Sequence, residues 1–95
     1  MGTSRSARHE ILQARIEVDR TTHDLVELIK RRDDAARKIA HAKKSLGMRI
    51  IDREREEFVL RQARKIASRR KVDPGLVNRI LRILILHSRK LQRKI

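Results

Sequence analysis

The stretch from Arg8 to Ser45 contains no glycine or proline, and its apolar residues recur with a heptad period. Such a repeat predicts one long helix whose apolar stripe packs against another helix. A helix over 8–45 is about 55 Å long, whereas a compact globule of this chain length has a radius of gyration of about 13 Å. We therefore expect the helix to lie along a second chain. The stripe consists of Ile11, Ala14, Val18, Leu25, Leu28, Ala35, Ile39, Ala42 and Leu46, and Thr21 and Arg32 interrupt it.

Two breaks divide the rest of the chain. Gly47 follows the long helix, and Asp52 then stands before an acid-rich stretch, which is typical of a helix N-cap. Asp73 and Pro74 form a second start signal, since proline is favoured at the first helical position. The predicted fold is all-α. Its parts are a disordered segment over residues 1–7 and a domain over 8–95 with helices over 8–45, 53–69 and 74–94.

The apolar positions of the two shorter helices predict which side chains are buried. In the second helix they recur at helical spacing, and in the third they form one face. We expect burial of Phe58, Leu60, Ala63, Ile66 and Ala67 in the second helix, and of Val77, Ile80, Leu81, Leu84, Leu91 and Ile95 in the third.

The chain carries a net charge of +14, and only 1% of its residues are aromatic. So little aromatic mass leaves a single chain poorly equipped to fill a core, which again favours a partner chain. The charge favours an anionic partner, either nucleic acid, an anionic membrane or a small polycarboxylate. There is no cysteine, no apolar run of the roughly 18 residues that span a bilayer, and no apolar signal segment at the start. We expect a cytoplasmic protein that binds no metal, because its four histidines show no metal-ligand spacing.

Polar residues occupy several positions that should be apolar. Ser88 and Gln92 lie one helical turn apart on the apolar face of the third helix. Arg32 interrupts the long stripe, and Lys43, eleven residues later, faces the same way about 16 Å along the axis. These residues either have hydrogen-bond or ion-pair partners within the fold and serve the structure alone, or they line a site that binds an anion. Arg15, about 25 Å from Arg32, reaches such a site only from an antiparallel partner chain.

Together, these positions resemble the all-helical chorismate mutase family. That family has a long first helix with Arg, then seventeen residues to Arg and eleven to Lys. An Asp-x-x-Arg-Glu motif starts its second helix, and its third helix carries Ser-x-x-x-Gln. The register holds over about four-fifths of this chain, although a Thr-Thr pair stands where Ile-Asp is common in the first helix. The matching residues are Arg15, Arg32, Lys43, Asp52, Arg55, Glu56, Ser88 and Gln92.

The resemblance implies an intertwined helical homodimer that rearranges chorismate to prephenate, a step of aromatic amino acid biosynthesis. The reaction is a concerted Claisen shift without cofactor or metal, so it depends on positioning and electrostatics. By the family pattern, Arg32, Lys43, Glu56 and Gln92 are catalytic. Substrate binding falls to Asp52, Arg55 and Ser88, together with Arg15 from the partner chain.

Within that pattern each residue has an expected role. Arg15 and Arg32 hold the two carboxylates of the substrate, with Ser88 assisting. Lys43 and Gln92 donate hydrogen bonds to the ether oxygen. Glu56 and the backbone near Asp52 hold the ring hydroxyl, and Arg55 lines the pocket and steadies the acids.

Three alternatives compete with this interpretation. The positive charge favours a nucleic-acid-binding helical protein, but stacking aromatics and a known reading motif are absent from the sequence. A purely structural coiled-coil dimer leaves Arg32, Ser88 and Gln92 unexplained. The related isochorismate-pyruvate lyase shares the scaffold, and the complete Asp-x-x-Arg-Glu, Lys43 and Gln92 set favours the mutase over it. We therefore predict a chorismate mutase with a dianionic substrate and expect neither a membrane nor a nucleic acid as partner.

Overall fold

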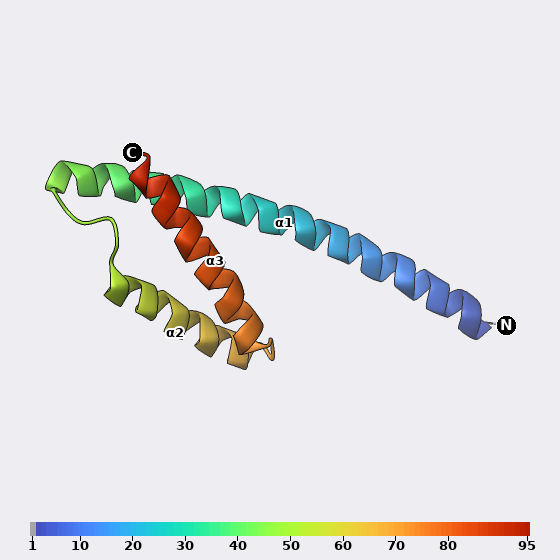
Figure 1. Ribbon diagram of the computed structural model, residues 1–95. Coiled ribbons are helices and arrows are strands. Elements are labelled where there is room, and N and C mark those ends of the chain that lie inside the picture. Colours follow the sequence, from blue (N-terminus) through green and yellow to red (C-terminus); the bar gives the residue numbers. More distant parts are fainter. Residues whose placement is uncertain (1) are drawn as a thin grey trace. The chain divides into compact units, whose positions relative to one another are not determined.

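The computed structural model describes residues 2–95, with side chains from Ser4 onward, and over this range it consists of three α-helices without strands (Figure 1). These are α1 (Gly2–Leu46), α2 (Arg53–Arg69) and α3 (Pro74–Arg93). The all-α prediction is confirmed at this level. The chain divides into an N-terminal unit, Met1–Arg32, and a C-terminal unit, Asp33–Ile95.

Except at the N-terminal end, the predicted helix boundaries lie within one residue of those in the structure. α2 covers the predicted range, and α3 ends one residue earlier than predicted. α1 begins at Gly2 rather than at Arg8, so the structure describes residues 2–7 as part of the helix. The reason is that Ser, Arg and Ala in this stretch are compatible with a helix and no residue there stops one. Met1 lies outside the described residues.

α1 ends in a Schellman motif at its glycine. Gly47 has a φ of +67°, in the left-handed region where glycine has no Cβ penalty. The Met48 N–H donates to the Lys43 carbonyl at 2.9 Å, and the Gly47 N–H donates to the Lys44 carbonyl at 3.3 Å. These bonds satisfy carbonyl groups that the helix end leaves without partners.

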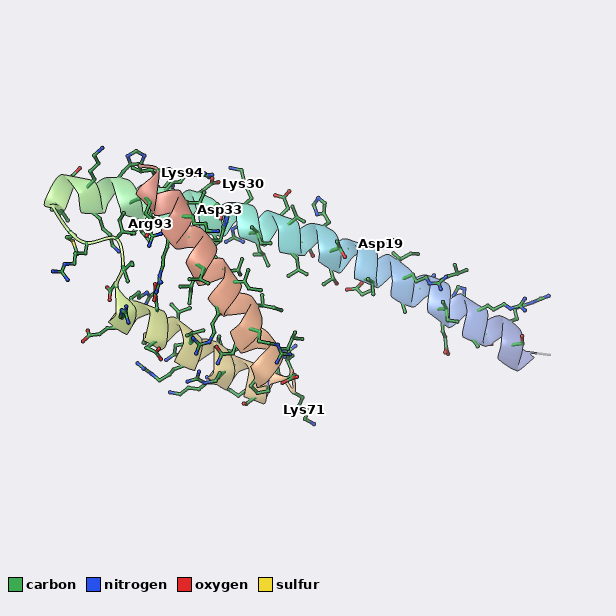
Figure 2. The ribbon with its side chains drawn as sticks, in the orientation of Figure 1. Asp19, Lys30, Asp33, Lys71, Arg93 and Lys94 are labelled. Carbon is green, nitrogen blue, oxygen red and sulfur yellow. The ribbon has the colours of Figure 1, made fainter. Side chains whose placement is uncertain are left out.

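The same motif ends α2, but with a lysine in the left-handed position. Lys71 has a φ of +57°, the Val72 N–H donates to the Ala67 carbonyl at 2.9 Å, and the Lys71 N–H donates to the Ser68 carbonyl at 3.3 Å. Figure 2 labels Lys71 in this turn. A non-glycine residue in this conformation costs roughly 1–2 kcal/mol. The tight turn leaves only a short link before α3.

Both predicted N-caps are confirmed. The Asp52 side chain accepts a hydrogen bond from the Arg55 N–H at 3.0 Å, and the Asp73 side chain accepts one from the Gly75 N–H at 2.9 Å. Pro74 occupies the first helical position of α3. Each cap satisfies a backbone donor that the first helical turn leaves free.

The core of the C-terminal unit is small. α2 packs directly against α3 (Figure 1). α3 meets the C-terminal part of α1 through longer side chains, as where His87 Nε2 lies 3.2 Å from Asp33 Oδ1. Asp33 is labelled in Figure 2. Its buried apolar side chains are Ala36, Ala40, Leu60, Ala67 and Ile85.

Three side chains predicted to be buried are exposed in this chain. Phe58 is 42%, Ile66 is 55% and Ile80 is 46% exposed, whereas Leu60 and Ala67 are buried as predicted. The prediction was wrong for Phe58 and Ile66 because α2 packs on one neighbour only, so a single narrow stripe of its surface is covered. Ile85, the buried residue of α3, was not among the predicted ones.

The N-terminal unit exposes its apolar stripe. Every described side chain from Ser4 to Arg31 is exposed. The hydroxyls of Thr21 and Thr22 donate to the carbonyls of Glu17 and Val18, at 2.8 and 2.9 Å, and so satisfy themselves within the helix. The exposed large apolar residues of this unit are Ile11, Leu12, Ile16, Val18, Leu25, Val26, Leu28 and Ile29.

Candidate active site

The C-terminal half of α3 carries Ser88 and Gln92 at half-buried positions. The Gln92 amide donates from Nε2 to the Ala36 carbonyl on α1 at 3.3 Å. This bond is long and therefore weak, so the amide can exchange it for a stronger acceptor. Ser88 lies one turn before Gln92 on the same side of the helix. The predicted pairing of these two residues on one face thus agrees with the helix that the structure forms.

Lys43 is half-buried in the last turns of α1, where its ammonium group donates to the Ile50 carbonyl at 2.7 Å. This bond ties the connector between α1 and α2 to the end of α1. An ammonium group has three donors, and the bond to Ile50 uses one of them.

Glu56, in the first turn of α2, forms a two-pronged ion pair with Arg89 of α3. Arg89 Nε donates to one carboxylate oxygen at 2.8 Å, and Nη2 donates to the other at 2.5 Å. The hydrogen bonds from Arg89 are the main reason that the pKa of Glu56 lies below its usual value, and partial burial opposes this effect. The side chains of Arg89 and Glu56 are 24% and 21% exposed. Glu56 is therefore a fixed and ionised carboxylate.

Sequence reasoning missed Arg89 because it did not identify Ile85 as buried. Arg89 follows Ile85 by four residues, so in the structure a charged side chain stands one turn after the buried position of α3. A charge in that place needs an acid opposite it. The prediction instead gave the role of steadying the acids to Arg55.

The ion pair makes a prediction about acid stability. The folded chain holds the pKa of Glu56 below its ordinary 4.5, so the pair stabilises the fold above that pH. The contribution is lost as pH falls through the lowered folded value. Glu56→Gln should therefore lower Tm at neutral pH and have a smaller effect at an acid pH, where the wild-type carboxyl is also protonated. Thermal unfolding followed by circular dichroism at both pH values measures this.

The matched control is Glu57→Gln, which removes the same charge from an exposed neighbour on α2. Its Tm should stay close to that of the wild type at both pH values. An equal drop in Tm for the Glu56 variant at both pH values would mean that the amide disturbs packing and that the ion pair contributes nothing.

Asp52 and Arg55 are exposed, and their side chains act locally. Asp52 caps α2, and the Arg55 guanidinium carbon lies 5.0 Å from the centroid of the Phe58 ring. That distance is within the range of a cation–π contact. In this chain the guanidinium that holds Glu56 thus belongs to Arg89 and not to Arg55.

The remaining two predicted residues lie on α1 in the N-terminal unit. Arg15 is exposed and Arg32 is half-buried. They are seventeen residues apart on one continuous helix, which separates them by about 25 Å along its axis. One small ligand cannot contact both of them in the same chain.

Among the residues that the structure describes, no group of three His, Cys, Asp or Glu side chains is arranged to hold a metal ion. Over residues 2–95, no helix is both long enough and apolar enough to cross a membrane.

Comparisons with known proteins address the same segment of the chain. The family described as chorismate mutase type II matches residues 14–93, a range that contains all eight predicted site residues. A chorismate mutase from Methanocaldococcus jannaschii is 31% identical over 85 residues, which is 90% of this chain and 86% of the relative. No solved structure shows a significant match.

Proposed function

Since this chain belongs to the chorismate mutase type II family, we propose that it rearranges chorismate to prephenate in sites shared between two copies of the chain. It is then an isomerase. The observation that carries the proposal is the set of half-buried polar side chains that the C-terminal unit holds at the family's spacing. They are Lys43, Glu56, Ser88 and Gln92. Aromatic amino acid biosynthesis follows from the family, and a cytoplasmic location stays a prediction.

The reaction breaks the ether C–O bond of chorismate and forms a C–C bond in one step. The substrate must first fold its enolpyruvyl arm over the ring, and negative charge grows on the ether oxygen as the bond breaks. A site for this reaction needs cations that hold two carboxylates and donors that meet the ether oxygen.

Two arginines hold the carboxylates in this proposal. A guanidinium matches a carboxylate with two parallel hydrogen bonds, which fixes both position and orientation. Arg32 serves the site of its own chain, and Arg15 comes from the partner because it lies about 25 Å away along α1. Ser88 assists with its hydroxyl.

Lys43 and Gln92 donate to the ether oxygen. The Lys43 ammonium keeps two donors beyond its bond to Ile50, and the Gln92 amide makes only a weak bond to Ala36. Both groups can therefore turn to an acceptor that becomes more negative during the reaction. Such donors accelerate the chemical step because they bind the transition state better than the substrate.

The start of α2 holds the ring hydroxyl. Glu56 accepts its hydrogen bond, and the backbone near Asp52 supports it. Arg55, exposed in this chain, completes the pocket wall when the two chains assemble.

A second copy of the chain is the partner that the N-terminal unit requires. Residues 4–31 of α1 expose a stripe of large apolar side chains, whose burial against an identical stripe is favourable. A two-fold arrangement makes both sites equivalent and brings Arg15 of each chain to the site of the other.

Mixing two inactive variants tests the sharing of sites. Arg15→Ala and Arg32→Ala chains should each be inactive alone. When unfolded together and refolded in equal amounts, half of the dimers are mixed, and each mixed dimer holds one intact site. The mixture should regain about one quarter of wild-type activity.

The controls are each variant refolded with itself, which should stay inactive. If Arg15 acts within its own chain, no mixed dimer holds an intact site, and the mixture stays as inactive as the single variants. That result would overturn the shared site while leaving the reaction itself open.

The reaction is tested by the loss of chorismate absorbance with purified protein and no added cofactor or metal. Saturable conversion with prephenate as the product supports the proposal. Release of pyruvate from isochorismate without action on chorismate would assign the chain to the lyase reaction of the same scaffold. Inactivity toward both substrates in a folded dimer would refute the proposed function.

A further inference from the structure

The ion pair between Glu56 and Arg89 joins the start of α2 to the half of α3 that carries Ser88 and Gln92. Arg89 directly follows Ser88 and lies three residues, about one turn, before Gln92. Its two nitrogens meet both carboxylate oxygens of Glu56, at 2.8 and 2.5 Å. This fork geometry fixes the orientation of the carboxylate as well as its place.

The pair lines a hollow between α2 and α3 of about 300 Å³, with Leu60 and Ile85 among its apolar walls. The hydrogen bonds from Arg89 lower the pKa of Glu56 more than the charge of the nearby Arg53 does. The other charged groups around Glu56 are Asp52, Arg53 and Glu57 of α2 and Arg82 of α3.

A carboxylate in a pocket for a dianion creates an electrostatic problem. It repels the carboxylates of the substrate unless a nearby cation offsets its charge. An ionised carboxylate has about four acceptor positions, and a two-pronged pair with Arg89 uses two of them. Arg89 therefore cancels the charge of Glu56 and leaves it able to accept a hydrogen bond from a hydroxyl.

We propose that Arg89 is a positioning residue that neutralises and orients Glu56 so that this carboxylate holds the ring hydroxyl of a dianionic substrate. The inference rests on the proposed function. It adds a residue outside the eight of the family pattern and gives that residue an effect on substrate binding.

The test compares the KM for chorismate of three variants with the wild type. Arg89→Met keeps an unbranched apolar side chain and removes the guanidinium charge, so KM at about pH 8 should rise about tenfold. Lys90→Met removes one positive charge from the exposed neighbour of Arg89 and should leave KM unchanged. The double variant Arg89→Met/Glu56→Gln removes both charges, and its KM should fall below that of Arg89→Met.

The pH dependence separates this role from a purely structural one. Without Arg89 the pKa of Glu56 returns toward its ordinary 4.5, and burial raises it further. As the pH is lowered from about 8 toward the pKa of Glu56 in the variant, this carboxyl takes up a proton, so the excess KM of Arg89→Met should shrink. A structural clamp would change Tm and the active fraction of the protein but not this pH profile.

A wild-type KM in the Arg89→Met variant would overturn the inference. So would an increase in KM that neither low pH nor Glu56→Gln relieves, measured well below the Tm of each variant. A wild-type protein that neither binds nor converts chorismate would refute the proposed function, and this inference would fall with it.

Discussion

Replacing Arg32 with alanine is expected to lower kcat/KM for chorismate by at least about a thousandfold. In the proposed site this guanidinium binds a substrate carboxylate through two hydrogen bonds, and no neighbouring cation has the same position. The loss should appear in both kcat and KM, because the contact orients the substrate as well as binding it. Steady-state kinetics with purified variants measures it.

The matched control is Arg31→Ala, the adjacent arginine, which is exposed. It removes the same charge from the neighbouring position and should keep kcat/KM close to the wild-type value. Arg32→Lys should recover only part of the lost activity, because an ammonium group keeps the charge but not the planar fork.

Arg32 is half-buried and has interactions of its own in the chain, so the fold of the variant must be checked. Circular dichroism and sedimentation should show a folded protein of unchanged size. A variant that unfolds would make Arg32 a structural residue. A folded variant with wild-type kinetics would remove it from the site.

Replacing Gln92 with alanine is expected to reduce kcat by about a hundredfold and to change KM little. The proposed acceptor of its amide, the ether oxygen, is a weak acceptor in the substrate and a strong one in the transition state. The bond that the variant loses in the free protein, to the Ala36 carbonyl, is long, so its loss should cost little stability. Single-turnover kinetics separates the chemical step from binding.

Gln62→Ala is the control for this prediction, since it removes an amide from a half-buried position on α2. It should leave kcat unchanged. A Gln92 variant whose KM rises while kcat stays constant would show that the amide binds the substrate uniformly, and the ether-oxygen role would be refuted.

The features that could be predicted from the sequence are those set by neighbouring residues. Asp52 and Asp73 act on backbone groups two or three residues away, so their caps are visible as local patterns. The end of α2 also agrees with the predicted range, although Lys71 there adopts a left-handed conformation that usually signals glycine. A turn that is held by backbone hydrogen bonds alone requires no particular side chain, so it is hard to recognise in the sequence.

Contacts between distant residues were the part that the sequence left undetermined. The partner of Glu56 lies thirty-three residues away, and the chain offers many arginines that could fill that role. Helical spacing limits the possible arginine partners of Glu56 to those on one face of a helix. The face of α2 that packs on α3, however, is determined by the residues of both helices together. The exposure of Phe58 and Ile66 has the same origin, because periodicity gives the direction of a stripe and not its width.

Three polar contacts at the C-terminal end of α1 share one property, which is that their acceptors are main-chain carbonyls. Gln92 donates to the carbonyl of Ala36, Lys43 to that of Ile50, and Lys44 to that of Ile95. Every amino acid supplies such a carbonyl, so a substitution at an acceptor position keeps the acceptor of the hydrogen bond. Which residues are tolerated there depends only on the size of the side chain. Mutational drift is thus tolerated on one side of each contact, while the donors Lys43, Lys44 and Gln92 must keep their chemistry.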